Sequence, residues 1–536
     1  MRNRLLLALL PAGSIALAWA CGGHTAASGG GNDGGLEAGV DAGDDADADY
    51  LDVAPGPDAT SGNCNLGDLM SDPGAGGDPI SLCVQQQILS QELQYAYTKG
   101  QGIAPGWAST APYAPLPRTS TSWQDDLSLA GAIGAFYCSA MVYGNNTSDS
   151  MLALDLNDLG GVLVPELQPA LAGGYDGETY FRLRWAQAAY NYANDTTAAA
   201  LQTMADTYAV SIANHAVDVT AAGGDAGSPG GMVIGVANAD GSVTYSPAQA
   251  VMAAAALLDM AVLQVTGIDG GAMQPSWASI AQQVITYVLA RGRDPVSGLF
   301  YQSLTTSGDP GHDAVAAGTP TNDSMLTETQ AWVILGLARA QDLLDTFESD
   351  IPEGGAPAVE LYDVEADGVA TSMANAGLFD GTTTPPAPPA AQPVGALMEG
   401  VILSGQQLLT DKTTIGNAIF LGGYHRVANT AGAAQAYELG QIRSALGAVP
   451  EGTVQLANTS LLTIVTDASG DLLQQAYLRA GSKSFHYASA YAAGGDPVAQ
   501  GQEPGATNYR VDADHAMIEG ITQLWIGAAS DARCAP

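Results

Sequence analysis

The sequence predicts an all-α protein whose folded part is one large domain of helical hairpins. Apolar residues recur at helical spacing from about residue 80 onward, as at Leu129, Ile133 and Phe136. Strand-like segments are few and short, and loops rich in Gly, Pro and Asn separate the helical segments. The longest alanine-rich segments are apolar on more than one side, which is typical of helices buried against other helices; they are 250–265, 280–289 and 325–344.

The N-terminal region predicts export. Residues 1–20 have two arginines, a short apolar run and small residues near the end, which is the build of a secretory signal. The run LAWAC that follows resembles the lipobox of bacterial lipoproteins, so Cys21 is the expected lipidation site. Residues 21–63 hold nine acidic residues and no Lys or Arg, which predicts a disordered tether. We therefore expect a signal peptide, a tether and one folded domain at 64–536, anchored in the outer membrane or at the surface of a Gram-negative bacterium.

The charge of the chain excludes one class of partner. There are 55 Asp and Glu residues against 16 Lys and Arg residues, a formal net charge of −39. Such a surface repels phosphate backbones, so we expect no nucleic-acid partner. Anionic membrane surfaces repel it as well, and the lipid on Cys21 is then the only expected contact with a membrane.

Four cysteines remain besides Cys21. An even set in an exported protein predicts two disulfides, for which three connectivities are open. We favour Cys64 with Cys534, which bracket the folded part, and Cys83 with Cys138, which fall in the first two predicted helices.

A loose repeat occurs in the second half of the chain, where Gly or Ser and aromatic residues lead into a helix that carries an early glutamate. The instances begin with GLFYQSL at 298, GLFDGTT at 377, GYHRVAN at 423 and SFHYASA at 484. Their spacing is too irregular for a solenoid and favours a closed arrangement. In its helix pairs, aromatic-led loops and acids near helix starts, the chain resembles the six-hairpin glycosidase-like proteins over roughly residues 80–530. That resemblance implies an (α/α)6 toroid with a carbohydrate-binding cleft at one end.

The stretch SWQDDLSLAG, residues 122–131, places two adjacent carboxylates early in a helix. Glycoside hydrolysis uses two carboxyl groups roughly 5 to 9.5 Å apart, a separation that such a pair can reach. An aromatic residue before paired aspartates is similar to the family 76 endo-α-mannanases, and this resemblance implies that Asp125 is the nucleophile and Asp126 the acid/base. Helix capping or an exposed position at the helix start is the alternative for either aspartate.

A second candidate set lies in DADHAMIEGITQLW, residues 512–525. Asp512, His515 and Glu519 fall at i, i+3 and i+7 and share one helix face. The combination suits a clamp for sugar hydroxyls or an acid/base group with a neighbour that shifts its pKa. Helix capping by the aspartate is the alternative here too. No second pair of residues has convincing metal-ligand spacing, so we expect neither a metal nor a cofactor.

Other side chains are candidates for binding the substrate, because aromatic faces stack on sugar rings and carboxylates accept their hydroxyl protons. These predicted binding residues are Trp123, Tyr180, Tyr301, Tyr424, Tyr487, Glu328 and Glu399. Arg182 and Arg184 stand out in a chain so poor in bases, and we expect them to neutralise buried acids.

The sequence thus favours a monomeric glycoside hydrolase that acts on a polysaccharide or oligosaccharide. The alternative is a non-catalytic surface lipoprotein that binds glycan or protein in the same cleft. A third hypothesis, a purely structural envelope protein, predicts no deep cleft. Motifs for serine hydrolases, phosphate loops and zinc proteases do not occur in the sequence.

Overall fold

The computed structural model describes separate stretches of the chain between residues 89 and 520. They are 89, 92, 97–98, 100–108, 116–142, 150–193, 195–219, 231–265, 276–306, 313–316, 324–350, 362–378, 397–403, 406–410, 412–413, 415–420, 422–423, 490–491, 497–498, 508–516 and 518–520. The predicted signal, tether and lipidation site lie outside these residues. So do three of the cysteines in the predicted disulfides, whereas Cys138 is buried in a helix.

Helices dominate the described residues, as the apolar periodicity predicts. They are α3 (Trp123–Val142), α4 (Ser150–Ala170), α5 (Gly177–Tyr192), α6 (Thr197–Asn214), α7 (Pro247–Val265), α8 (Ser276–Arg291), α9 (Thr327–Asp350) and α10 (Tyr362–Asn375). Residues 415–420 and 422–423 are also helical, and so are residues 511–516 and 518–520. We call this last pair of ranges the C-terminal helical segment.

The strands are two or three residues long and pair antiparallel. They are β1 (Tyr97–Thr98), β2 (Gly102–Ile103), β3 (Gly106–Ala108), β4 (Ala216–Asp218), β5 (Met232–Ile234), β6 (Val236–Ala237), β7 (Val243–Tyr245), β8 (Leu304–Thr305), β9 (Ala314–Val315), β10 (Ser324–Leu326), β11 (Gly400–Ile402), β12 (Gln407–Leu409), β13 (Lys412–Thr413), β14 (Ala490–Tyr491), β15 (Pro497–Val498) and β16 (Asn508–Arg510). Most of them lie in the connections between helices, and β6, β7, β8 and β9 form a four-stranded sheet.

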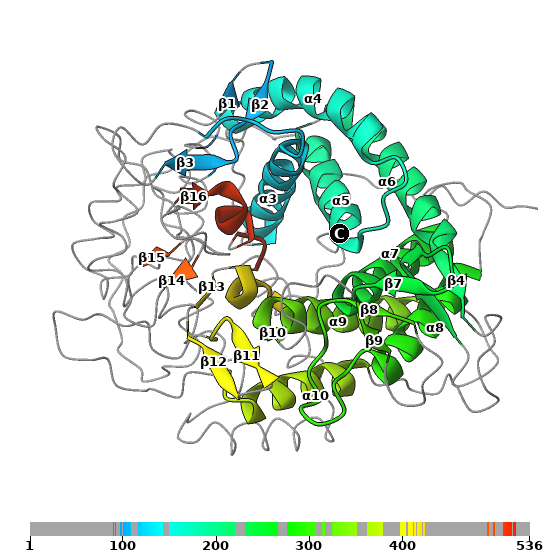
Figure 1. The fold of residues 1–536 in the computed structure, drawn as a ribbon. Coiled ribbons are helices and arrows are strands. Elements are labelled where there is room, and N and C mark those ends of the chain that lie inside the picture. Colours follow the sequence, from blue (N-terminus) through cyan, green and yellow to red (C-terminus); the bar gives the residue numbers. More distant parts are fainter. Residues whose placement is uncertain are drawn as a thin grey trace, which may run out of the picture. The chain divides into compact units, whose positions relative to one another are not determined.

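Consecutive helices pack as hairpins. The pairs α3 with α4, α5 with α6, α7 with α8, and α9 with α10 are each in contact. The first members of these pairs also contact one another in chain order, from α3 through α5 and α7 to α9 (Figure 1). Helix α7 shows why the alanine-rich runs adopt this position: every residue from Ala250 to Ala261 is buried, so the helix is covered on all sides.

Contacts between distant parts of the chain bring the last described helical segments back to the first helix, α3. Strand β16 pairs with β3, with Tyr509 opposite Trp107, although 402 residues separate them. Helix α9 abuts residues 422–423, where a side chain at Gly423 would overlap the backbone of Leu335. Gly520 lies equally close to the backbone of Ala418, and the C-terminal helical segment contacts α3. Within the described residues, a closed series of neighbours therefore runs from α3 through α5, α7 and α9 to residues 415–420 and 422–423 and the C-terminal helical segment, and back to α3. We call these the inner helices.

The apolar interior also contains charged groups that are paired. Asp259 on α7 is 4% exposed, accepts a 2.5 Å hydrogen bond from the Tyr180 hydroxyl and lies 3.3 Å from Arg184 Nε. The prediction that Arg184 neutralises a buried acid is therefore confirmed. In the part of the chain described, no helix has the length and apolarity needed to cross a membrane.

Candidate functional site

A small pocket lies between the inner helices. Its wall combines two glutamates and two arginines with three aromatic side chains and several aliphatic ones. The lining residues are Glu178, Phe181, Arg182, Trp185, Met252, Trp332, Leu335, Arg339, Ile419, Gly422, Ala516, Glu519 and Gly520.

Helix α5 supplies the first part of the wall. Asp176 caps this helix: its carboxylate accepts hydrogen bonds from the Glu178 backbone N–H at 3.0 Å and from the Thr179 hydroxyl at 2.7 Å. The cap fixes the first turn, from which the Glu178 side chain projects. Arg182 and Trp185 follow at i+4 and i+7, so the three side chains share the face of α5 that lines the pocket.

Arg182 lies close to both glutamates of the pocket. Its Nη2 is 2.6 Å from Glu178 Oε1, and its Nε is 4.0 Å from Glu519 Oε1 on the C-terminal helical segment. All three side chains are partly exposed, between 13% and 20%. Because one guanidinium reaches both carboxylates, their oxygens are no further apart than the roughly 9.5 Å spanned by a glycosidase carboxyl pair. Arg182 therefore contacts carboxyl groups, as expected, but these are partly exposed and not buried acids.

The surroundings of Glu178 favour its protonated form. Desolvation raises the pKa of its carboxyl to about 8, and Arg182 opposes this while the charges of Asp176, Glu519 and Glu328 add to it. The Glu178 carboxyl is then mostly protonated at neutral pH. For Arg182, burial disfavours the charged form, but the neighbouring carboxylates outweigh burial and raise its pKa.

Aromatic side chains form much of the remaining wall. Trp185 and Trp332 are 3% and 8% exposed, and the Arg339 guanidinium lies 4.2 Å from the centre of the Phe181 ring. A pocket with aromatic surfaces beside carboxyl groups can hold a ligand that has both apolar faces and hydroxyl groups.

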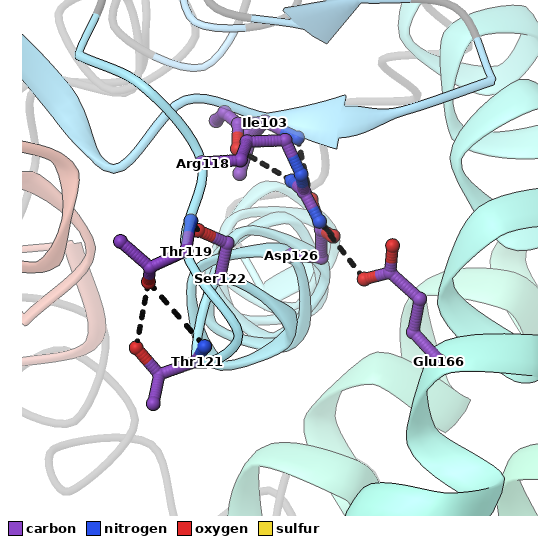
Figure 2. Close-up of polar contacts among 7 residues, drawn as sticks. All are labelled: Ile103, Arg118, Thr119, Thr121, Ser122, Asp126 and Glu166. Atoms are coloured by element: carbon purple, nitrogen blue, oxygen red, sulfur yellow. Dashed lines mark hydrogen bonds and ion pairs between the residues drawn. The ribbon is translucent and has the colours of Figure 1, made fainter.

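The predicted pair Asp125 and Asp126 has a different position (Figure 2). Asp126 is fully buried and accepts a 2.6 Å hydrogen bond from the Ile103 backbone N–H. It also accepts hydrogen bonds from Arg118 Nη1 at 3.1 Å and Nη2 at 2.8 Å. The same Arg118 donates to Glu166 on α4 at 2.8 Å and to the Ile103 carbonyl at 2.5 Å.

These contacts make Asp126 part of the framework. It joins β2 to the start of α3 and, through Arg118, to α4. Gly102 has φ +84°, and a side chain there would overlap the Asp126 carboxylate. Burial raises the pKa of Asp126 to about 6, and the hydrogen bonds from Arg118 and Ile103 oppose the rise. Neither Asp126 nor the half-buried Asp125 lines the pocket described above.

The second predicted set is divided by the structure. His515 is fully buried; its Nδ1 is 2.8 Å from the Ser128 hydroxyl and its Nε2 is 2.7 Å from Glu92 Oε2. Both ring nitrogens are thus engaged with protein groups. Asp512 is half-buried and close enough for its charge to act on Arg182. Of the three, Glu519 lines the pocket.

Two predicted binding tyrosines lie in the interior. Tyr180 is fully buried and donates to Asp259, and burial raises the pKa of its hydroxyl. Tyr301 is 9% exposed and donates a 3.0 Å hydrogen bond to Asp294. Both hydroxyls therefore satisfy buried or partly buried carboxylates of the fold, and neither ring lines the pocket.

Of the other predicted binding residues, those that the structure describes lie at or near the first residues of α3 and α9. Trp123 is half-buried and packs against the core at the beginning of α3. Glu328 is half-buried at the beginning of α9, and its charge contributes to the raised pKa of Glu178. The Glu399 carbonyl accepts a 2.8 Å hydrogen bond from the Thr327 N–H, next to Glu328. Tyr424 and Tyr487 lie outside the described residues.

Sequence reasoning did not single out four functionally important residues of the pocket wall: Glu178, Trp185, Trp332 and Arg339. For Trp185 a signal was present, because Glu178, Arg182 and Trp185 fall at i, i+4 and i+7 of one predicted helix. Trp332 and Arg339 share the same i, i+7 relationship in α9. A repeated polar and aromatic spacing on two inner helices would have indicated one common pocket.

No protein-family model matches the sequence, and no curated protein sequence matches it. Solved structures do resemble it. An unsaturated glucuronyl hydrolase specific for heparin aligns with a TM-score of 0.50 and 12% identity, over 84% of this chain and 98% of that chain. The unsaturated glucuronyl hydrolase from Streptococcus agalactiae aligns with a TM-score of 0.52 and 10% identity, over 89% of this chain and 96% of that chain.

An α-1,6-mannanase variant of Salegentibacter, in complex with α-1,6-mannotriose, aligns with a TM-score of 0.44 and 10% identity, over 83% of this chain and 100% of that chain. The likeness to the two glucuronyl hydrolases shows the fold: the chain is an (α/α)6 toroid. The predicted fold class is confirmed.

Proposed function

We propose that the chain is a glycoside hydrolase that uses Glu178 and Glu519 as its pair of carboxyl groups. The observation that carries the proposal is the placement of both glutamates around Arg182 in a pocket walled by Trp185 and Trp332. Glycosidases need two carboxyl groups at limited separation, with one of them protonated at working pH.

Glu178 is the proposed general acid. A carboxyl group with a pKa of about 8 still holds its proton at neutral pH and can give it to the glycosidic oxygen as the bond to the leaving sugar breaks. Glu519 is the proposed base or nucleophile. Arg182 lies beside it and stabilises negative charge at that position.

The tryptophans support a sugar ligand. Indole faces pack on the apolar faces of pyranose rings, and two of them border the carboxyl groups. Two structural neighbours with the same fold are hydrolases of glucuronyl sugars by their own descriptions, which favours a polysaccharide or oligosaccharide over other substrates here. Fold alone does not give function, so the pocket carries the proposal.

We also propose that the protein is exported and anchored by a lipid on Cys21, and that it acts as a monomer. The support for export and anchoring is the sequence of residues 1–63, which has the build of a secretory signal, the run LAWAC and an acidic stretch that we expect to be a tether.

The test is a polysaccharide and oligosaccharide panel against the full chain and the variants Glu178→Gln and Glu519→Gln. Each variant is expected to lower kcat/KM on the substrate found by about a hundredfold or more, since each loses an acid–base group while its shape is kept. Glu166→Gln serves as the control, because it removes an acid of the Arg118 cluster outside the pocket. Unchanged hydrolysis in both pocket variants would overturn the proposal. Binding of a glycan without any hydrolysis would instead favour the non-catalytic alternative.

A further inference from the structure

The C-terminal helical segment brings Glu519 to the pocket, and His515 is the deeply buried polar side chain one turn before it. The imidazole is 0% exposed and lies 2.8 Å from the Ser128 hydroxyl on α3 and 2.7 Å from Glu92 Oε2. Glu92 is also fully buried. A polar group in such surroundings is stable only in the orientation that satisfies both of its hydrogen bonds.

The same two elements meet again one turn further on. On α3, Gly131 follows Ser128 by three residues, and a side-chain carbon built on Gly131 would lie 3.4 Å from Glu519 Oε1. The pairs Ser128 with His515 and Gly131 with Glu519 are therefore successive contacts between α3 and the C-terminal helical segment. A rotation of this segment that breaks the first contact also displaces the second.

We propose that His515 is a positioning residue: its hydrogen bonds to Ser128 and Glu92 hold the C-terminal helical segment at the rotation that keeps the Glu519 carboxylate beside Arg182. Its catalytic consequence rests on the proposed function, whereas the positioning itself does not.

Further attachments hold the segment at its two ends. Strand β16 and the hydrogen bond from the Val511 N–H to the Pro105 carbonyl, 3.2 Å long, hold its beginning. Close packing of Gly520 on Ala418 holds its end. Apolar contacts resist rotation weakly, because a small turn exchanges one apolar neighbour for another. The directional bonds of His515 therefore resist rotation of the segment against α3 more strongly than the apolar contacts do.

A neutral imidazole satisfies both bonds at once. Burial lowers the pKa of His515 to about 4, with Asp514, Glu519 and Asp125 opposing. The neutral ring has one N–H, so we assign the proton to Nε2, which donates to Glu92, and the lone pair to Nδ1, which accepts from the Ser128 hydroxyl. Replacement of either partner leaves a buried polar atom without its bond.

Displacement of Glu519 has an effect that can be measured without substrate. The groups that face Glu178 are Arg182 on α5, Asp176 at its cap, Glu328 on α9 and Glu519 from the C-terminal helical segment. The charge of Glu519 raises the pKa of Glu178, so removal or displacement of that charge lowers it. Loss of an unrelated buried hydrogen bond does not change this pKa.

The experiment titrates the Glu178 carboxyl by ¹³C NMR in the full chain labelled with ¹³C-glutamate, with the resonance assigned by its loss in Glu178→Gln. His515→Asn and Glu519→Gln are expected to lower the pKa by about one unit, the size typical of one nearby carboxylate. Ser128→Ala is expected to lower it by less. Tyr287→Phe is the matched control: it removes a 2.9 Å hydrogen bond to the buried Asp313, and its Glu178 pKa should equal that of the wild type.

Wild-type titration in both Ser128→Ala and His515→Asn would overturn the inference, and so would a shift of equal size in Tyr287→Phe. If His515→Asn does not fold, the result for Ser128→Ala decides. Because the titration needs no turnover, an absence of hydrolysis in the wild type would overturn the proposed function and leave the positioning test intact.

Discussion

Glu178 Oε1 lies 2.6 Å from Arg182 Nη2, one turn along the same face of α5. Such proximity to a cation alone would keep a carboxyl ionised, yet desolvation and three neighbouring acids outweigh Arg182 and raise the pKa of Glu178 to about 8. The carboxyl therefore combines a fixed orientation with a proton that it retains at neutral pH. These are the two properties required of a general acid.

The first prediction concerns the pH dependence of hydrolysis. Activity should fall as the pH rises through about 8, because Glu178 then loses the proton that the leaving group requires. The measurement is kcat/KM against pH on the substrate identified by the glycan panel. Glu178→Asp, which keeps an acid in a shorter side chain, should keep an alkaline limb at a different pH. An alkaline limb that is identical in Glu178→Gln would contradict the assignment.

The second prediction concerns stability. The folded-state pKa of Glu178 is raised above its ordinary value of 4.5, so the unfolded chain gives up this proton at lower pH than the folded one. The contribution of Glu178 to the free energy of unfolding is therefore full below about pH 4.5 and is lost as the pH rises through about 8. Urea unfolding across this range should show the wild type losing stability relative to Glu178→Gln. A constant difference between the two would exclude the raised pKa.

The third prediction tests whether Asp125 and Asp126, at the start of α3, have a structural or a catalytic role. Asp126→Ala should lower the free energy of unfolding by about 3 kcal/mol, since it leaves Arg118 and the Ile103 N–H without the carboxylate. Asp125→Ala should cost less, because its side chain is only half-buried. Urea unfolding measures both. On the identified substrate, the double variant Asp125→Asn, Asp126→Asn should change kcat/KM less than tenfold. A loss as large as that of Glu178→Gln would instead support the aspartate pair.

The fourth prediction tests the aromatic wall. Trp332→Leu should weaken glycan binding by about tenfold, which corresponds to the loss of one stacking contact. Trp277→Leu on α8 is the control, because that side chain is equally buried at 7% exposed and does not line the pocket. Calorimetry with the substrate and an inactive Glu178→Gln background measures the difference. Equal weakening in both variants would indicate a general loss of structure.

The helices could be predicted from the sequence because long alanine-rich runs such as 250–261 leave no polar face and must be buried on all sides. Ring closure was suggested by the irregular spacing of the repeat and by resemblance, but the pairing of β3 with β16 could not be predicted, since it joins residues that share no local pattern. The short strands carry too few residues for an alternation to appear.

The site could be predicted only in part. Glu519 was identified because it shares a helix face with other polar residues. Glu178 was not singled out, because many acids lie near predicted helix starts. Asp126 was chosen for chemistry because an aspartate in a first helical turn fits a cap, a buried ion pair and a catalytic group equally well. The hydrogen bond from Arg118 shows that Asp126 belongs to a buried ion pair. The sequence could not show this, because the approach of Arg118 to Asp126 depends on how the loop before α3 folds.

The antiparallel contact of β3 with β16 has a consequence for synthesis of the chain. Residues near Trp107 leave the ribosome long before those near Tyr509. Strand β3 therefore has no β16 to pair with until almost the entire domain has been translated. Glu519 emerges later still. A nascent chain stopped by a premature termination codon before residue 508 would lack both the partner strand and one carboxyl group of the pocket, and its unpaired early strand would be open to aggregation.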